Sequence, residues 1–322
     1  MTFLSLRRAL VLAACASATL LAACGSSTTV SALNPTRIIG FGDAFSVVTP
    51  GASYTVNDSA INTWIGQFAS SYGLTVAPSA SGGLIYAQGN ARINTTPDAA
   101  GNSSTLTVKQ QIDSFLTSGT LGSSDLVLIN GGISDIVVDM AAVTAGTETE
   151  AQMLANATQY GKDLGAQVRR LVTAGAQHVV VVGPYNLGVS PWATALGKGS
   201  LLQSASSKLN EAMLVSVVDL GANVLYIDAA YYFNLVQDSP SSYGLSNSTL
   251  LACTSTDAGA GIGIGAGEVN SSLCTTSTIA AITANSAGTT YDLYMFADKI
   301  YMTPLAQRLF GLYAYSKVHT RW

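Results

Sequence analysis

The chain contains four short apolar runs, at residues 36–42, 125–132, 178–184 and 223–228. Runs of this length without polar alternation are typical of strands that are covered on both faces. The third is the clearest, because His178 is followed by four successive valines. The pattern therefore predicts four buried strands.

The segments around these runs carry apolar residues at helical spacing. We expect helices at about 57–73, 108–116, 148–174, 200–219 and 304–315. Asn57 or Asp58 is expected to cap the first, and Gly73 to end it. Its apolar face comprises Ile61, Trp64, Ile65 and Phe68. Residues 79–105 are rich in Ser, Gly, Asn and Thr and are expected to be loop.

Strands that alternate with helices predict an α/β fold with a parallel sheet flanked by helices. Functional groups in such folds collect at the carboxyl ends of the strands. Three strand ends with glycines mark that edge here, at residues 42–46, 130–135 and 183–188. Candidate chemistry is therefore expected at these three segments.

The first 35 residues are typical of an exported protein. Arg7 and Arg8 precede an apolar run of 15 residues, which is shorter than the ~20 that a spanning helix needs. The following Leu21-Ala22-Ala23-Cys24 resembles the lipobox of bacterial lipoproteins, whose cysteine is acylated. We expect a signal peptide at 1–23, a lipidated Cys24 with a flexible tether at 24–35, and one domain at 36–322. An ordinary signal peptide with an incidental cysteine is the alternative.

Gly25 after this cysteine resembles an outer-membrane address in Gram-negative bacteria, although a Gram-positive host stays open. The predicted location is thus the bacterial cell envelope, with the membrane as a partner through the lipid. The composition is 48% hydrophobic and 10% charged, with a net charge of -4. Such sparse charge argues against nucleic acid. With two histidines and no Cys-x-x-Cys pair, neither a metal nor a cofactor is expected.

Of the four cysteines, Cys15 leaves with the signal peptide and Cys24 takes the lipid. Cys253 and Cys274 remain as an even pair in an exported chain, and we expect a disulfide between them. The alternative is two free buried thiols.

Four segments at the strand ends resemble the conserved blocks of the SGNH, or GDSL, hydrolases, in the correct order over about residues 36–315. They are Phe41-Gly42-Asp43-Ala44-Phe45-Ser46, Tyr86-Ala87-Gln88-Gly89-Asn90-Ala91, Gly132-Ile133-Ser134-Asp135, and Asp298-Lys299-Ile300-Tyr301 before Pro304. Trp64 and the pair Cys253 and Cys274 resemble features of one branch of this family, the bacterial esterases and autotransporter passengers. The resemblance implies a three-layer α/β domain with flavodoxin-like strand order.

Each block departs from the family at the residue that does the chemistry. The nucleophilic serine falls on Ala44, and the histidine base falls on Tyr301. The oxyanion glycine falls on Asn90, or on Gly89, and the oxyanion asparagine falls on Ser134. Only the triad aspartate is retained, as Asp298. The resemblance makes Asp43 and Asp135 supports of the strand-end loops.

Acyl transfer through serine needs a hydroxyl and a base within hydrogen-bond reach. Ala44 has no hydroxyl, and the phenol of Tyr301 has an ordinary pKa of about 10, too high for a base near neutral pH. Ser46 is the nearest substitute, two residues away, and a misplacement of ~1 Å can cost about a hundredfold. His178 and His319 are expected to be a strand-end residue and part of a solvated tail.

We therefore expect a pseudoenzyme that binds an acylated glycan, a lipid or an envelope protein in or near the old pocket, with Tyr301 filling the space of the histidine. One alternative is an ester hydrolase that uses Ser46 or Ser134, with Asp298 or Tyr301 assisting. Another is a structural envelope protein. Four aromatic residues near the cysteine pair, expected to be core more than site, are Tyr231, Tyr232, Phe233 and Tyr243.

Overall fold

The central sheet has four parallel strands in the order β1-β2-β3-β4. They are β1 (Arg37–Phe41), β2 (Asp125–Asn130), β3 (Val179–Val182) and β4 (Val224–Tyr226). Every residue of β2 and β3 is buried, as expected of strands with helices on both sides. All four predicted strands are therefore present.

This computed structural model describes residues 31–58, 60–259, 265–281 and 290–322. Residues Leu33–Trp322 form one compact unit. The predicted signal peptide at 1–23 and the predicted lipid site Cys24 lie outside the described residues. Within the described part of the chain, no helix combines the length and the apolar composition that crossing a membrane requires.

A fifth segment extends the sheet beyond β1. The amide of Gly40 donates to the carbonyl of Leu84 (3.0 Å), and the amide of Tyr86 donates to the carbonyl of Gly40 (2.7 Å). These bonds make a parallel bridge between Gly40 and Ile85 on the edge of β1 that β2 does not use. When this segment is counted as the second strand along the chain, β2, β3 and β4 become the third, fourth and fifth. The order across the sheet is then 2-1-3-4-5, which is the flavodoxin-like order.

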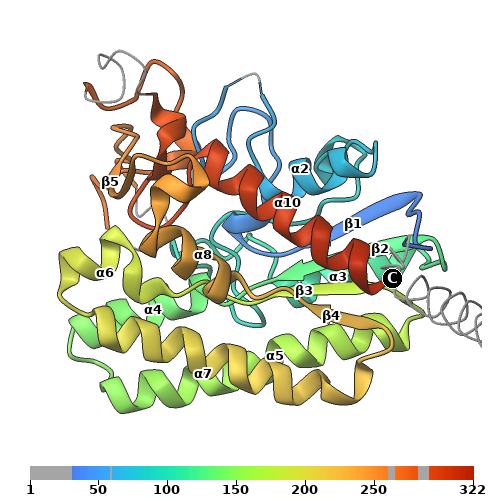
Figure 1. Ribbon diagram of the computed structural model, residues 1–322. Coiled ribbons are helices and arrows are strands. Elements are labelled where there is room, and N and C mark those ends of the chain that lie inside the picture. Colours follow the sequence, from blue (N-terminus) through green and yellow to red (C-terminus); the bar gives the residue numbers. More distant parts are fainter. Residues whose placement is uncertain (1–30, 59, 260–264, 282–289) are drawn as a thin grey trace, which may run out of the picture. The chain divides into compact units, whose positions relative to one another are not determined.

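Helices cover both faces of the sheet, so the domain has the three layers that the sequence predicts (Figure 1). On one side lie α5 (Glu150–Thr173) and α7 (Gly199–Val217). They approach closely, because a Cβ on Gly161 of α5 would lie 2.1 Å from the carbonyl oxygen of Leu209. On the other side lie α2 (Trp64–Ser71) and α10 (Pro304–Arg321), with α8 (Ala229–Asp238) packed on α10. α3 (Val108–Ser118) packs between α5 and β1.

The start of α2 corrects the sequence prediction. Its N-cap is Thr63, whose hydroxyl accepts from the amide of Gly66 (3.1 Å), and not Asn57 or Asp58. The side-chain amide of Asn57 instead donates to the carbonyl of Cys274 (3.1 Å). Ile61, expected on the buried face, lies outside the helix and is 41% exposed.

Three helices follow strand ends where the sequence analysis expected none. They are α4 (Ile133–Thr144), α6 (Pro191–Leu196) and α8. α4 begins directly after β2, at Gly132, whose φ of 109° favours glycine. Short 3-10 helices include η2 (Ala44–Ser46) and η3 (Ser79–Ser81).

A small second sheet pairs β5 (Asn247–Leu251) with β6 (Tyr294–Phe296). Cys253 and Cys274 form the predicted disulfide next to it. Of the four aromatic residues considered earlier, Tyr232 and Phe233 are buried in the core, whereas Tyr231 is exposed.

Candidate functional site

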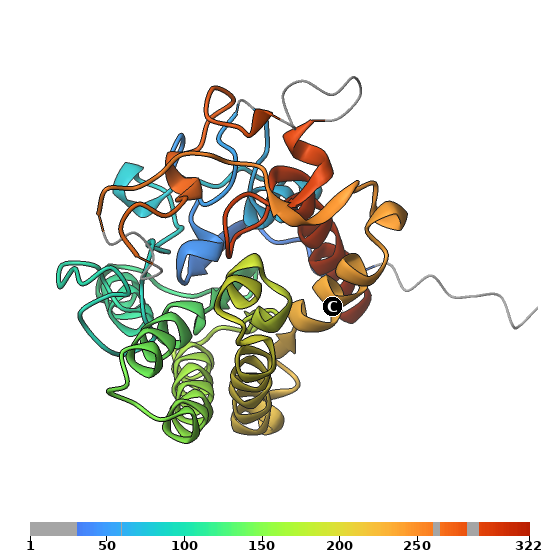
Figure 2. The same ribbon diagram turned by 90° about the vertical axis from the view of Figure 1, so that its left-hand side faces the viewer.

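The loops after the strands meet at one end of the sheet, which faces the viewer in Figure 2. The blue η2 segment, which follows β1, and the red segment before α10 lie near the middle of this view. These are the first and last of the family-like blocks, and the contacts below place the other two beside them. The sequence prediction of one shared edge therefore holds for the geometry of these segments.

The first block is held by bonds to two other segments. Asp43 caps η2, since its carboxylate accepts from the amide of Phe45 (3.0 Å), and it also accepts from the side-chain amide of Asn130 (2.6 Å) at the end of β2. Burial raises the pKa of Asp43 to about 6, although the bonds from Phe45 and Asn130 oppose this shift. Asp43 is therefore a fully buried support of the loop.

Gln111 of α3 holds the neighbouring glycine from the other side. Its side-chain oxygen accepts from the amide of Gly42 (2.8 Å), and its nitrogen donates to the carbonyl of Gly42 (2.9 Å). Gln111 was not a candidate in the sequence analysis, and Asn130 was included only as part of the strand-end segment 130–135. Their only sequence signal was a polar residue inside an otherwise apolar helix face or strand.

The second block lies against the first. The amide of Gln88 donates to the carbonyl of Gly42 (3.2 Å). A Cβ on Gly89 would lie 2.1 Å from the hydroxyl oxygen of Tyr54, so only glycine fits there. Asn90 adopts a left-handed conformation with a φ of 63°, which asparagine tolerates better than most residues.

The third block lies in the first turn of α4. The carboxylate of Asp135 accepts from Nε of Arg92 (3.1 Å) and from the amide of Ile93 (3.0 Å), so it ties α4 to the segment after the second block. Burial raises the pKa of Asp135 to about 6, against the opposing charge of Arg92. Ser134 beside it is buried. Asp135 thus has the loop-supporting contacts that the resemblance implies.

The last block contains the retained aspartate. One oxygen of Asp298 accepts from the amides of Ile300 (2.8 Å) and Tyr301 (2.7 Å), and the other accepts from the amide of Ser271 (3.0 Å). Burial raises the pKa of Asp298. Both carboxylate oxygens are therefore engaged by the backbone, and they hold the disulfide loop against the turn before α10.

Tyr301, in the last block, packs against the loop that follows the first block. Its ring packs edge-on against Tyr54, with 5.1 Å between the ring centroids. Burial raises the pKa of the Tyr301 phenol well above its ordinary value, and the nearby charges of Asp43 and Asp298 raise it further. Tyr301 is 1% exposed and Ala44 is 2% exposed. The positions of the family's base and nucleophile are thus enclosed in packed protein.

Neither histidine lies beside the two serines considered as substitutes, Ser46 and Ser134. The hydroxyl of Ser46 is buried and accepts from Nε1 of Trp64 (3.3 Å). His178 lies at the amino end of β3 against Trp322, and His319 stacks on Tyr315 in α10. Both histidines therefore lie at the opposite end of the sheet from Ser46 and Ser134.

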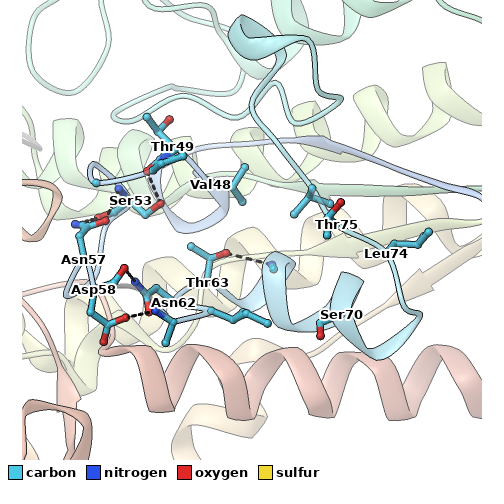
Figure 3. A pocket seen from close by; sticks show the side chains of 16 residues that line it. Val48, Thr49, Ser53, Asn57, Asp58, Asn62, Thr63, Ser70, Leu74 and Thr75 are labelled. Carbon is cyan, nitrogen blue, oxygen red and sulfur yellow. Dashed lines mark hydrogen bonds between the residues drawn. The ribbon is translucent and has the colours of Figure 1, made fainter.

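A separate open groove lies between the segment after η2 and helix α2 (Figure 3). Its volume is about 360 Å³. Its lining is uncharged apart from Asp58, and it combines hydroxyl and amide groups with aliphatic ones. The lining includes Val48, Thr49, Ser53, Asn57, Ile61, Asn62, Ser70, Leu74, Thr75 and Val76. The sequence analysis missed this groove, because the way residues 48–76 fold around α2 is not encoded in their local pattern.

Asp58 in this groove already has partners. One oxygen accepts from the amide of Ala60 (2.7 Å), and the other accepts from the hydroxyl of Tyr291. No group of three or more His, Cys, Asp or Glu side chains that could hold a metal occurs among the residues described.

The comparisons with known proteins identify no family for this chain, so the resemblance to SGNH hydrolases stays a prediction. No protein-family model matches the chain, and no curated protein matches it. One similar crystal structure is 14% identical, with the alignment covering 61% of this chain and 88% of that chain at a TM-score of 0.38. Another is 16% identical over 66% of this chain and 86% of that chain, at a TM-score of 0.40. Likeness at this level carries no argument, and the α/β fold rests on the sheet and layers described above.

Proposed function

We propose that this chain is a non-hydrolytic binding protein of the bacterial cell envelope, built on an SGNH-hydrolase-like domain and anchored by lipid on Cys24. The observation that carries the proposal is the burial of Ala44 and Tyr301, which stand where the resemblance puts the nucleophile and the base. A serine hydrolase needs both groups within reach of a substrate. Here one has no hydroxyl and the other is a buried phenol.

The alternative hypothesis, an ester hydrolase, lacks an available general base. Ser46 is engaged with Trp64, and the carboxylate of Asp298 is engaged with three backbone amides. Loss of nucleophile and base together leaves at most the ~10³ to 10⁴ over water that binding and an oxyanion hole provide. The oxyanion positions are changed as well, to Asn90 and Ser134, so we expect a rate below this limit and close to the uncatalysed background.

The groove in Figure 3 supports the binding part of the proposal. Its volume of about 360 Å³ falls in the range of small-molecule sites. Because its lining is nearly uncharged and mixes hydroxyl or amide groups with aliphatic ones, it suits a neutral ligand with both kinds of surface. An acylated glycan is such a ligand. Anionic headgroups find no lysine or arginine in this lining.

Hydrolysis of p-nitrophenyl acetate and butyrate tests the non-hydrolytic part. The domain of residues 26–322 should give the buffer rate, whereas Ala44→Ser combined with Tyr301→His should raise it if the blocks are aligned as in the family. Turnover by the natural chain that disappears in Ser46→Ala or Ser134→Ala would overturn the proposal.

Titration calorimetry with acylated and deacylated glycan fragments tests the binding part. Ser70→Trp should abolish binding, because the indole would occupy the groove at an exposed position of α2. Ser114→Trp on the exposed face of α3 is the matched control and should bind normally. Equal binding by both variants would exclude the groove.

A further inference from the structure

The chain enters and leaves the described domain at the same end of the sheet. The amide of Leu33 donates to the carbonyl of Trp322 (3.3 Å), and β1 begins at Arg37, four residues after Leu33. Figure 1 shows the carboxyl terminus at this end, beyond the far end of α10. The strands run away from it, so the buried site lies at the opposite edge, more than the ~16 Å length of β1 away.

The end of α10 at this edge is basic and aromatic. Helix α10 carries Arg308, Lys317 and Arg321 and no acidic residue, although the whole chain has a net charge of -4. Arg308 pairs with Asp292 near the start of the helix. Lys317 and Arg321 lie exposed in its last two turns and have no carboxylate partner among the residues that the structure describes. Lys317 lies over the ring of Tyr313, and Arg321 donates to the carbonyl of Gly221 (2.6 Å). Tyr315 and Trp322 lie half-buried beside them.

We infer that the α10 terminal surface, defined by Lys317, Thr320, Arg321 and Trp322, rests on an anionic membrane surface, so that the carboxyl edge of the sheet points away from that membrane. The inference rests on the proposed lipid anchor at Cys24. Eight residues separate Cys24 from Leu33, and a chain of that length spans at most about 30 Å. The amino edge of the sheet is therefore held near the bilayer.

Two features then select this surface for the contact. Basic side chains next to an anionic leaflet are attracted to it within a Debye length. Tyrosine and tryptophan favour the boundary between headgroups and hydrocarbon, because they have both apolar and polar parts. A domain docked in this way presents the loops after β1, β2 and β3 to the opposite side, where a partner approaches from solution.

Two exposed threonines form a matched pair for the test. Thr320 lies at the end of α10, and Thr194 lies on α6, which follows the carboxyl end of β3. Each donates its hydroxyl to the carbonyl four residues earlier, Ser316 and Ser190 respectively. Because Cys253 and Cys274 are bonded to each other and Cys24 carries the lipid, Thr320→Cys or Thr194→Cys adds a single reactive thiol.

The full mature chain is labelled at each thiol with a fluorophore and reconstituted in vesicles of phosphatidylcholine and phosphatidylglycerol that contain a headgroup spin label. We expect quenching of most of the fluorescence at residue 320 and none at residue 194. Lys317→Gln should lower the docked population about fivefold, as expected for one basic residue near an anionic surface. Lys162→Gln, an exposed change on α5, should leave it unchanged.

Mass spectrometry of the same preparations reports the lipid on Cys24. Equal quenching at both positions, or stronger quenching at residue 194, in a lipidated chain overturns the orientation and leaves the anchor intact. A mature chain without lipid overturns the anchor and the orientation with it. The p-nitrophenyl ester assay is independent of both, so a failure of the non-hydrolytic proposal is recognised separately.

Discussion

The ring of Tyr301 meets the ring of Tyr54 edge-on, with 5.1 Å between the centroids and 62° between the ring planes. The hydroxyl of Tyr54 in turn lies where a side chain at Gly89 would have to go. The last and the second family-like blocks are therefore packed together through two tyrosines. In a hydrolase, a reactive carbonyl would need part of this volume.

Truncation of Tyr301 should be costly, because its ring is buried among other side chains. Tyr301→Ala should lower the free energy of unfolding by about 3–5 kcal/mol, the usual range for removal of a large buried aromatic side chain. Tyr301→Phe keeps the ring and should cost less than about 1.5 kcal/mol. Urea denaturation measures both. Similar losses for the two variants would contradict a packing role for the ring.

The two hydrogen bonds between the side chain of Gln111 and the backbone of Gly42 predict a second effect on stability. Gln111→Ala removes both bonds to the backbone of Gly42 and leaves its buried amide unpaired, whereas its carbonyl keeps the bond from the amide of Gln88. An unpaired buried group costs about 1–3 kcal/mol. We expect a loss of about 1–3 kcal/mol in thermal or urea unfolding. Ser114→Ala, an exposed change in the same helix, is the control and should change stability little.

Asp43 predicts a distinctive dependence of stability on pH. Burial raises its pKa from 3.8 in the unfolded chain to about 6 in the folded one. Between these values the folded state keeps a proton that the unfolded chain has lost. The contribution of Asp43 to stability is therefore fully present below about pH 4 and is lost as pH rises through about 6. At ~1.4 kcal/mol per pKa unit, the loss is about 3 kcal/mol at most.

The measurement is the melting temperature of the natural chain and of Asp43→Asn from about pH 4 to about pH 7. Because asparagine does not titrate, the natural chain should lose stability relative to the variant as pH rises. Burial raises the pKa of Asp135 in the same direction, and the charge of Asp43 raises it further, so the difference between the two chains reports both carboxyl groups together. Parallel pH profiles would show that Asp43 titrates normally.

Removal of the disulfide should lower stability and loosen the turn at Asp298. Cys253 and Cys274 are separated by 21 positions, and closing a loop of this length is worth about 3 kcal/mol in the chain-entropy model. The loop also supplies the amide of Ser271 to Asp298. The double variant Cys253→Ser, Cys274→Ser should therefore have a lower melting temperature in calorimetry. A reducing agent should lower the melting temperature of the natural chain and leave that of the variant unchanged. An unchanged melting temperature would show that the loop is held without the bond.

Features that depend on neighbours along the chain could be predicted from the sequence. The apolar runs identified all four strands of the central sheet, because burial of a strand on both faces demands consecutive apolar residues. The cysteine pair predicted the disulfide. The sequence also determines that Ala44 and Tyr301 stand where the resembled family has its serine and histidine, since the identity of a residue does not depend on the fold.

Tertiary structure decided which polar groups meet. Asn57 is a good capping residue, yet it bonds to Cys274, 217 positions away, and Thr63 caps α2 instead. Asn130 reaches Asp43 across 87 positions. Helical and strand periods reflect burial summed over near neighbours, whereas a hydrogen-bond partner is chosen by three-dimensional proximity. That Tyr301 and Ala44 are both enclosed in the protein and not open to substrate is therefore a property of the packed domain, and the chain's local pattern could not determine it.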